Sequence, residues 1–197
     1  MAEMTNSVET RLHKALVDIR SLADEMAQRS SFRVTFEDFH VMGADEIRDW
    51  QDIVREESGD TAYTLPTELV DIYRLTGGFD FRWTCDANAG LIEGTVMLVS
   101  LPELFQRDDE RDKPMKQCMT SWRRFDDISP DTYAAIRLDG ATAGLKCVYF
   151  MGDRLVRMNI SPRDYIAAAA EHLGIRGWQV IDTEELKKVV RELAAWK

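Results

Sequence analysis

The chain has 197 residues, of which 45% are hydrophobic and 30% are charged, a balance that is ordinary for a globular protein and excludes a mostly disordered chain. No run approaches the roughly 18 apolar residues of a membrane span, and the first residues lack the order of a signal peptide, so we expect a cytoplasmic protein. The net charge is −10, and residues 1–100 hold 19 Asp and Glu against 9 Lys and Arg, whereas the remainder is balanced. This acid excess argues against direct binding to nucleic acid or to an anionic membrane. It favours a basic protein partner, or it serves solubility alone.

The first quarter of the chain predicts a helix, a strand and a second helix. Apolar residues recur at helical spacing from Asn6 onward, which predicts a long amphipathic helix within residues 1–30. Residues 32–36 alternate between apolar and polar side chains, as a short half-buried strand does. Residues 44–57 return to helical spacing, and Gly59 is placed to end that helix.

The second of these helices carries a row of acids. Its apolar side chains, Ile47, Trp50, Ile53 and Val54, are expected to face inward. The acids Asp45, Asp49, Asp52 and Glu56 follow one another at spacings that align them along one face. Neighbouring like charges cost a helix about 0.2–0.5 kcal/mol each. The row is therefore either a solvated face, softened by Arg48 and Arg55, or a surface kept for a basic partner.

Residues 65–83 join a helix, a double glycine and an aromatic strand. Pro66 suits the first helical turn, where a missing N–H costs nothing. Gly77 is expected to end the helix at positive φ, and Gly78 to let the chain turn back. Aromatic and charged side chains then alternate over residues 79–83, which predicts a half-buried strand.

Strands predominate in the next part of the chain. Residues 94–100 form a nearly continuous apolar run, which predicts a strand buried on both faces, and residues 101–105 add a helical turn. Residues 106–117 are charged and poor in apolar side chains, the marks of a surface loop. Further strands are expected near residues 133–138, 146–151 and 155–159, the last two joined at Gly152 and Asp153 as a hairpin.

Residues 160–179 repeat the capped-helix pattern. Ser161 suits the N-cap and Pro162 the first helical position, the helix continues over residues 162–173, and Gly174 ends it. A final amphipathic helix is predicted within residues 180–197.

The stretches 65–83 and 160–179, in this order, resemble the SUKH superfamily. That superfamily includes the Smi/Knr-type cell-wall regulators of fungi and many bacterial immunity proteins that neutralise polymorphic toxins. The resemblance covers about residues 40–180 and implies a structural role for the matching positions, with partner contacts elsewhere. These positions are Leu65, Pro66, Tyr73, Gly77, Gly78, Trp83, Tyr165, Gly174, Trp178 and Gln179.

The sequence offers no catalytic motif. His13, His40 and His172 are isolated, and there is no zinc-hydrolase, nucleophile-elbow or phosphate-loop pattern. Acid pairs such as Asp126 with Asp127 stand in polar, surface-like sequence. Cys85, Cys118 and Cys147 are widely spaced and odd in number, so we expect buried free thiols. We therefore expect no enzyme activity, no metal and no cofactor.

The order of helices, strands and helices predicts an α+β fold. We expect a single domain over residues 1–197, with a mostly antiparallel, curved sheet and helices at both chain ends. The resemblance implies a bacterial immunity protein that binds and neutralises a cognate toxin, a nuclease or other nucleic-acid-modifying effector, by stoichiometric occlusion. The side chains that would then face the basic cleft of that toxin are Asp45, Asp49, Asp52, Glu56 and Asp80. Two alternatives stay open, a non-enzymatic regulator or adaptor of the Smi/Knr type and an unrecognised small-molecule enzyme.

Overall fold

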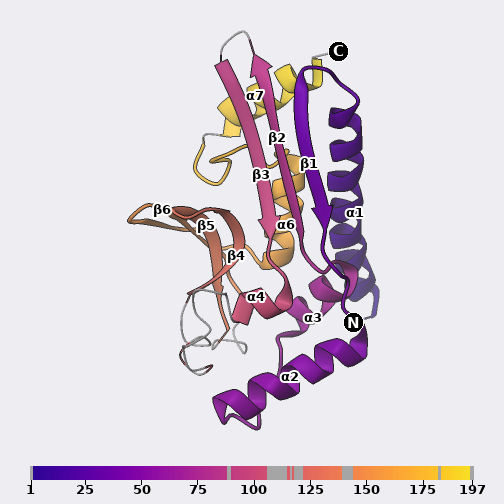
Figure 1. The fold of residues 1–197 in the computed structure, drawn as a ribbon, viewed down its shortest axis with the longest axis vertical. Helices are drawn as coiled ribbons and strands as arrows, with labels where there is room; N and C mark the ends of the chain where they lie inside the picture. The colour runs from indigo at the N-terminus through magenta and orange to yellow at the C-terminus, as the bar shows by residue number, and fades with distance from the viewer. Residues whose placement is uncertain are drawn as a thin grey trace. The chain divides into compact units, whose positions relative to one another are not determined.

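The computed structural model forms two compact units, and each is built from segments that are distant in the chain. The first unit contains Met1–Glu37, Asp80–Met97 and Asp164–Lys197, and the second contains Asp38–Phe79 and Leu98–Arg163. The structure describes residues 2–87, 90–105, 115, 117, 122–138, 144–181 and 183–195. The strands follow one another in hydrogen-bonded order from β1 to β7, as they do in the chain. Figure 1 shows the course of the chain.

The predicted α+β class is confirmed, with antiparallel strand pairs and helices at both chain ends. The prediction of one domain over the whole chain stays a prediction.

The first unit packs helices against three strands. It holds α1 (Ala2–Ala27), β1 (Phe32–Asp38), nearly all of β2 (Phe79–Ala87) and β3 (Gly90–Leu98), most of α6 (Pro162–Glu171), and α7 (Thr183–Ala195). In Figure 1 the axis of α1 follows the direction of these strands. The core is formed by apolar side chains of all of these elements, among them Leu12, Leu16, Ile19, Phe32, Phe81, Trp83, Val96, Ile166 and Leu186. The helical spacing of residues 6–26 and the alternation of residues 79–83 are thus confirmed.

Within the described ranges, the second unit contains three helices and the last four strands. Its elements are α2 (Ala44–Ser58), α3 (Thr67–Leu75), α4 (Leu101–Phe105), β4 (Trp122–Ser129), β5 (Thr132–Arg137), β6 (Val148–Met151) and β7 (Arg154–Arg157). Successive strands pair antiparallel, with Trp122 opposite Arg137 and Met151 opposite Arg154. The predicted hairpin at Gly152 is confirmed, and its φ of 57° supplies the left-handed residue that a two-residue turn needs.

Strand β4 was missed by the sequence analysis because its inward side chains include charged residues. Arg123 is 3% exposed, and its guanidinium donates to the carbonyl oxygens of Leu104 (2.8 Å) and Phe105 (2.9 Å). Asp126 is also fully buried, so the prediction that Asp126 lies in surface-like sequence was wrong. A buried charge is tolerated where hydrogen bonds replace its hydration, and here backbone carbonyls supply them to Arg123.

Strand β3 differs from its prediction as well. It begins at Gly90, and its burial alternates, with Val96 and Leu98 buried while Thr95 and Met97 are partly exposed. The strand therefore has one buried face and not two. Apolar side chains on both faces do not require burial on both, because much of a protein's surface is apolar. The expected loop of residues 106–117 lies largely outside the described residues.

The first residue of the double glycine, Gly77, is required for a different reason from the one predicted. Helix α3 runs from Thr67, with Pro66 as its N-cap, to Leu75. Its C-cap, Thr76, is in an extended conformation, with φ −151°. Gly77 has no positive φ. A Cβ at Gly77 would overlap the carbonyl group of His40 and lie 2.8 Å from the carbonyl oxygen of Phe39. The left-handed cap predicted at Gly77 was wrong, and the residue must be glycine because another backbone segment passes against it.

We predict that Gly77→Ala lowers the free energy of unfolding by about 2 kcal/mol or more, since a rigid backbone cannot yield to the added methyl group. Urea unfolding measures this loss. The matched control is Gly43→Ala, because Gly43 has φ −68° and its Cβ would meet only the Glu46 side chain, at 3.4 Å. Equal midpoints for the two variants would contradict the close approach at Gly77.

Candidate functional site

Helix α2 is fixed at both ends by local hydrogen bonds. At its start the N–H of Gly43 donates to the Glu46 carboxylate (2.7 Å), and His40 Nε2 lies 3.1 Å from Glu46 Oε1. The Gly43 hydrogen bond, and then His40, hold the pKa of Glu46 below its usual range. At the other end Gly59 adopts φ 71°, the left-handed cap that the sequence predicted. The helix thus presents a defined surface.

One face of α2 packs inward through Ile47 and Val54, which are 5% and 0% exposed. Trp50 is half-buried and lies edge-on against Phe105, with ring centroids 6.2 Å apart. The expectation that Ile53 faces inward was wrong, because its side chain is 38% exposed.

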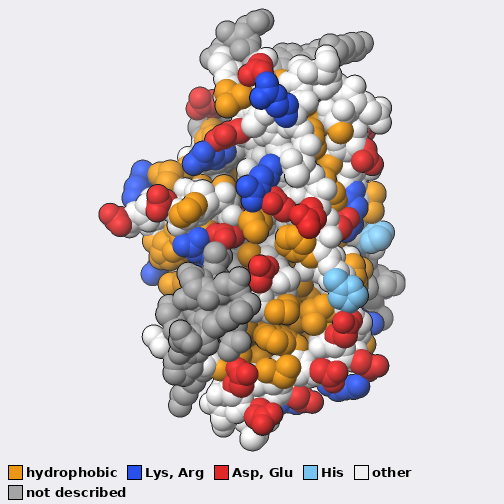
Figure 2. Space-filling model, in the orientation of Figure 1, with side chains coloured by type: hydrophobic (Ala, Val, Ile, Leu, Met, Phe, Trp, Pro, Cys, Tyr) orange, Lys and Arg blue, Asp and Glu red, His pale blue; other side chains and the backbone are white. Residues whose placement is uncertain are grey.

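The opposite face carries the four predicted acids, all of them exposed. Two of these acids are paired along the helix, Asp45 with Arg48 (2.6 Å) and Asp52 with Arg55 (2.8 Å). Arg48 and Arg55 therefore lie close enough to these acids to soften the like-charge repulsion, as the sequence predicted. Figure 2 shows acidic side chains gathered where α2 lies in Figure 1.

The other two acids, Asp49 and Glu56, form no ion pair within the described ranges of the chain. Ile53 follows Asp49 by four residues and precedes Glu56 by three, so the three side chains are helical neighbours. We call Asp49, Ile53 and Glu56 the α2 face. It combines one exposed apolar side chain with two carboxylates that form no ion pair among the described residues.

Asp80 lies in the first unit, whereas α2 belongs to the second. Its side chain is only 18% exposed, and its carboxylate pairs with Arg82 Nε at 2.8 Å. Asp80 is therefore less accessible to a partner than the acids of α2.

The residues of the family resemblance are packed inside the two units. In the second unit Tyr73 is fully buried and donates its hydroxyl hydrogen to the carbonyl oxygen of Val99 (2.9 Å). Leu65 is buried, and its N–H donates to Gln51 Oε1 (2.9 Å). Gly78 has φ 104°, and a Cβ there would lie 2.9 Å from the Phe39 ring.

The resemblance residues of the first unit form one cluster at the end of α6. Trp83 is 1% exposed and donates its indole N–H to the carbonyl oxygen of Leu173 (2.7 Å). Gly174 adopts φ 61° beside Val96, as expected for a helix stop. Trp178 lies 5.2 Å from the Tyr165 ring, and Gln179 Nε2 donates to the Tyr165 hydroxyl (2.9 Å). Trp83, Tyr165 and Trp178 are buried and Gln179 is half-buried, so these contacts serve the fold.

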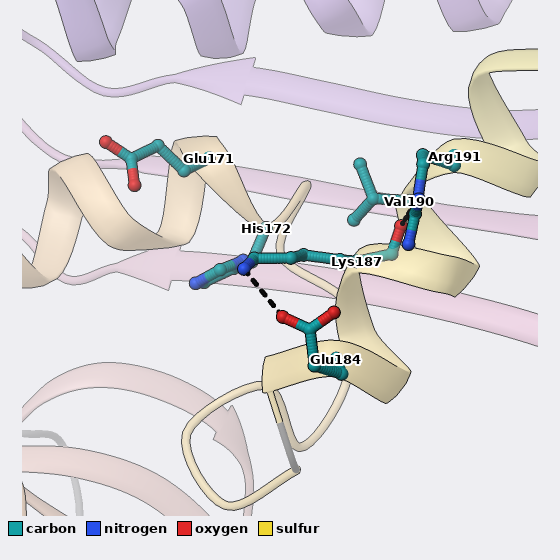
Figure 3. A pocket seen from close by; sticks show the side chains of 6 residues that line it. All are labelled: Glu171, His172, Glu184, Lys187, Val190 and Arg191. Atoms are coloured by element: carbon teal, nitrogen blue, oxygen red, sulfur yellow. Dashed lines mark hydrogen bonds and ion pairs between the residues drawn. The ribbon is translucent and has the colours of Figure 1, made fainter.

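A pocket of about 460 Å³ lies between α6 and α7. Its lining consists of Glu171, His172, Glu184, Lys187, Val190 and Arg191. Figure 3 shows Glu184 and Lys187 facing each other beside His172, and their 2.8 Å ion pair is exposed. His172 lies against the Trp178 ring. Burial lowers the pKa of the His172 imidazole, and the nearby Glu171 partly offsets this lowering. The six lining residues thus bring a histidine beside an exposed ion pair, and no Ser, Thr or Cys side chain that could act as a nucleophile is among them.

Other kinds of site were sought in the described residues. Cys85 and Cys147 are buried thiols in no disulfide, as predicted, whereas Cys118 lies outside those residues. No group of His, Cys, Asp or Glu side chains in the described ranges could hold a metal ion. None of the described helices is long and apolar enough to cross a membrane.

Comparison with family models, with curated proteins and with solved structures finds no match for the chain. The site is therefore argued from its geometry and charge.

We predict that Glu46→Gln destabilises the protein near pH 7 by removing the carboxylate that Gly43 and His40 stabilise. A pKa held below the ordinary value of 4.5 contributes stability above that pH, and this stability is lost as pH falls through the folded-state pKa. The free energies of unfolding of E46Q and the parent protein should converge as the pH is lowered past that point. Urea unfolding over an acidic pH series measures this.

The control for that series is Glu56→Gln, because Glu56 has no partner in the described part of the chain and should change stability little at any pH. A deficit of E46Q that persists unchanged in acid would show that the ionised carboxylate is not its cause.

Proposed function

We propose that this protein is a bacterial immunity protein that binds a basic toxin domain and neutralises it by covering its active surface. The observation that carries the proposal is the α2 face, where Asp49 and Glu56 are unpaired and flank the exposed Ile53. The acid excess of residues 1–100 and the resemblance of residues 65–83 and 160–179 to the SUKH superfamily support it.

Charge would control how fast the complex forms. The net charge of −10 attracts a basic domain from a distance, and complementary charge raises association rates by orders of magnitude at low salt. At the ionic strength of the cell, dissolved salt screens this attraction beyond about 8 Å. A carboxylate of α2 within that range of the partner would contribute more than one elsewhere on the surface.

Apolar contact would control how long the complex lasts. Buried anchors at the centre of an interface supply most of its binding energy, and charged groups around them exclude water and set the register. Ile53 has the position of such an anchor between two acids. An interface of about 1,200–2,000 Å² would extend well beyond this one helix.

A toxin that acts on nucleic acid fits this surface chemically. Nucleases and nucleic-acid deaminases hold phosphates in basic clefts, because basic side chains displace the counterions of the substrate. Carboxylates spaced along a helix would occupy the positions of those phosphates. The inhibition would then be stoichiometric, with one immunity protein covering one toxin domain.

The first test is charge reversal on α2. The partner is captured from the native cells with the tagged protein, eluted by rising salt and purified. Asp49→Lys combined with Glu56→Lys should slow its association by about tenfold or more at low salt, and the difference should shrink at high salt. The matched control replaces Asp24 and Glu25, two exposed acids of α1, with lysine, and so changes the net charge by the same amount. Equal slowing by both double variants would mean that only the total charge matters.

The second test concerns the lifetime of the complex. Ile53→Ser should raise the dissociation rate of the captured partner about tenfold, because it removes an apolar anchor, and should leave association nearly unchanged. Val17→Ser is the control, since Val17 is exposed to a similar degree on α1 (44% against 38%). A dissociation rate unaffected by Ile53→Ser would remove α2 from the interface.

A further inference from the structure

A second surface of opposite charge lies at the end of the strand order. β7 is the last strand, so only β6 pairs with it among the described residues. Arg154, Leu155 and Arg157 are exposed and Val156 is half-buried. Alternate N–H and C=O groups of an antiparallel strand point away from its neighbour. Within the described residues, β7 therefore has backbone donors and acceptors along one edge that no other strand pairs.

The two faces of β7 carry the same combination of side chains. Because side chains alternate along a strand, Leu155 and Arg157 share one face, and Arg154 and Val156 share the other. Each face thus offers one guanidinium and one aliphatic group. Neither arginine pairs with a carboxylate in the part of the chain that the structure describes. These are two unpaired cations in a protein of net charge −10.

The face that carries Leu155 continues as an apolar surface over the neighbouring strands. Leu155 lies opposite Phe150 of β6, which in turn lies opposite Tyr133 of β5. The Phe150 and Tyr133 rings stack at 4.8 Å and 21°, and the Arg124 guanidinium lies 4.2 Å above Tyr133. Figure 2 shows hydrophobic, basic and acidic side chains together where β5 and β6 lie in Figure 1.

We propose that the β7 edge binds an extended, acidic segment of another polypeptide, which adds to the sheet as a further strand. Free backbone groups supply the hydrogen bonds of strand addition, and the side chains on either face select the sequence. Charged residues normally protect an edge from other strands. Arg154 and Arg157 repel basic strands and attract acidic ones, so this protection is selective.

Single-stranded nucleic acid is the other anionic polymer that binds surfaces with arginine and aromatic residues, and it does so by stacking bases on free ring faces. Here Phe150 stacks on Tyr133 and the Arg124 guanidinium lies over the same ring, whereas Trp122, edge-on to Phe150, is 39% exposed. The unpaired backbone edge of β7 favours a polypeptide, because a strand can pair with it and a nucleic acid cannot.

The sequence of β7 defines a matching probe. Arg154, Leu155, Val156 and Arg157 are complemented position by position by the tetrapeptide Glu-Val-Val-Glu, which reads the same in both directions and so fits a parallel or an antiparallel register. A fluorescein-labelled, end-capped peptide Thr-Glu-Val-Val-Glu-Thr, titrated with the full chain, reports binding by anisotropy. We expect saturation with a Kd on the order of 100 µM at low salt, weakening as salt rises.

Two peptide isomers test strand addition itself. N-methylation of alternate residues blocks the hydrogen bonds of one edge of the peptide and leaves the other edge intact. One isomer should lose binding and the other should keep it, since only one edge pairs with β7. Equal affinity for both isomers would overturn the proposal. A titration that shows no saturation when the protein concentration reaches roughly 3 mM, far above the expected Kd, would also overturn the proposal.

Variants of the protein test whether the peptide binds at β7. Arg154→Glu with Arg157→Glu should lower the peptide affinity about tenfold, because each exposed pair contributes at most about 1 kcal/mol. Arg74→Glu, at an exposed arginine of α3, is the control and should change the affinity by less than about twofold. Equal losses in both, or tighter binding of an oligothymidylate than of the peptide with the same dependence on Arg154 and Arg157, would overturn the proposal.

Discussion

The close approach of three backbone segments at the double glycine is the constraint on which the second unit depends. Residues 39–40 lead into α2, residues 77–78 leave α3, and residues 98–99 lead into α4. The N–H of Phe39 donates to the carbonyl oxygen of Gly78 (3.0 Å), and a Cβ on either glycine would overlap one of the other segments. His40 takes part twice, with its carbonyl group against Gly77 and its ring beside Glu46. The start of α2, and with it the α2 face, is therefore located by glycines that lie thirty residues away in the chain.

In each of the two units, some large polar side chains are buried where they donate to a backbone carbonyl oxygen. Tyr73 donates to Val99, Trp83 to Leu173 and Arg123 to Leu104 and Phe105. A buried donor without a partner would cost about 1–3 kcal/mol, so each hydrogen bond determines which loop must lie beside which side chain. Such residues specify the scaffold. Tyr73 and Trp83, two positions of the proposed SUKH resemblance, are of this kind, so the proposed partner would have to be recognised by other side chains, on the surface.

The sequence predicted best where one periodicity decides the structure, as in α1 and in the alternation of Phe79, Phe81 and Trp83. It failed where tertiary contacts override a local pattern. Arg123 and Asp126 made β4 resemble surface sequence, because the carbonyls that receive Arg123 come from a distant helix. The absence of a side chain at Gly77 was read as a local turn signal, and the segment that passes against it cannot be seen in local sequence. Ile53 was assigned to the core by hydrophobicity alone, although its helical position beside Asp49 and Glu56 indicated the acidic face.

The second unit thus carries two surfaces of opposite charge, the α2 face and the β7 edge. Complementary surfaces on one chain favour self-association, and a head-to-tail contact of this kind gives either a closed ring or an open filament. Two properties oppose that outcome. Copies of a chain with net charge −10 repel one another at long range, and each surface contains only two unpaired charges of its kind. A foreign partner that is basic throughout meets no such repulsion at the α2 face, whereas an acidic segment meets attraction only within a Debye length of Arg154 and Arg157. The whole-molecule charge therefore favours fast encounter at α2 and restricts the β7 edge to segments that are delivered close to it.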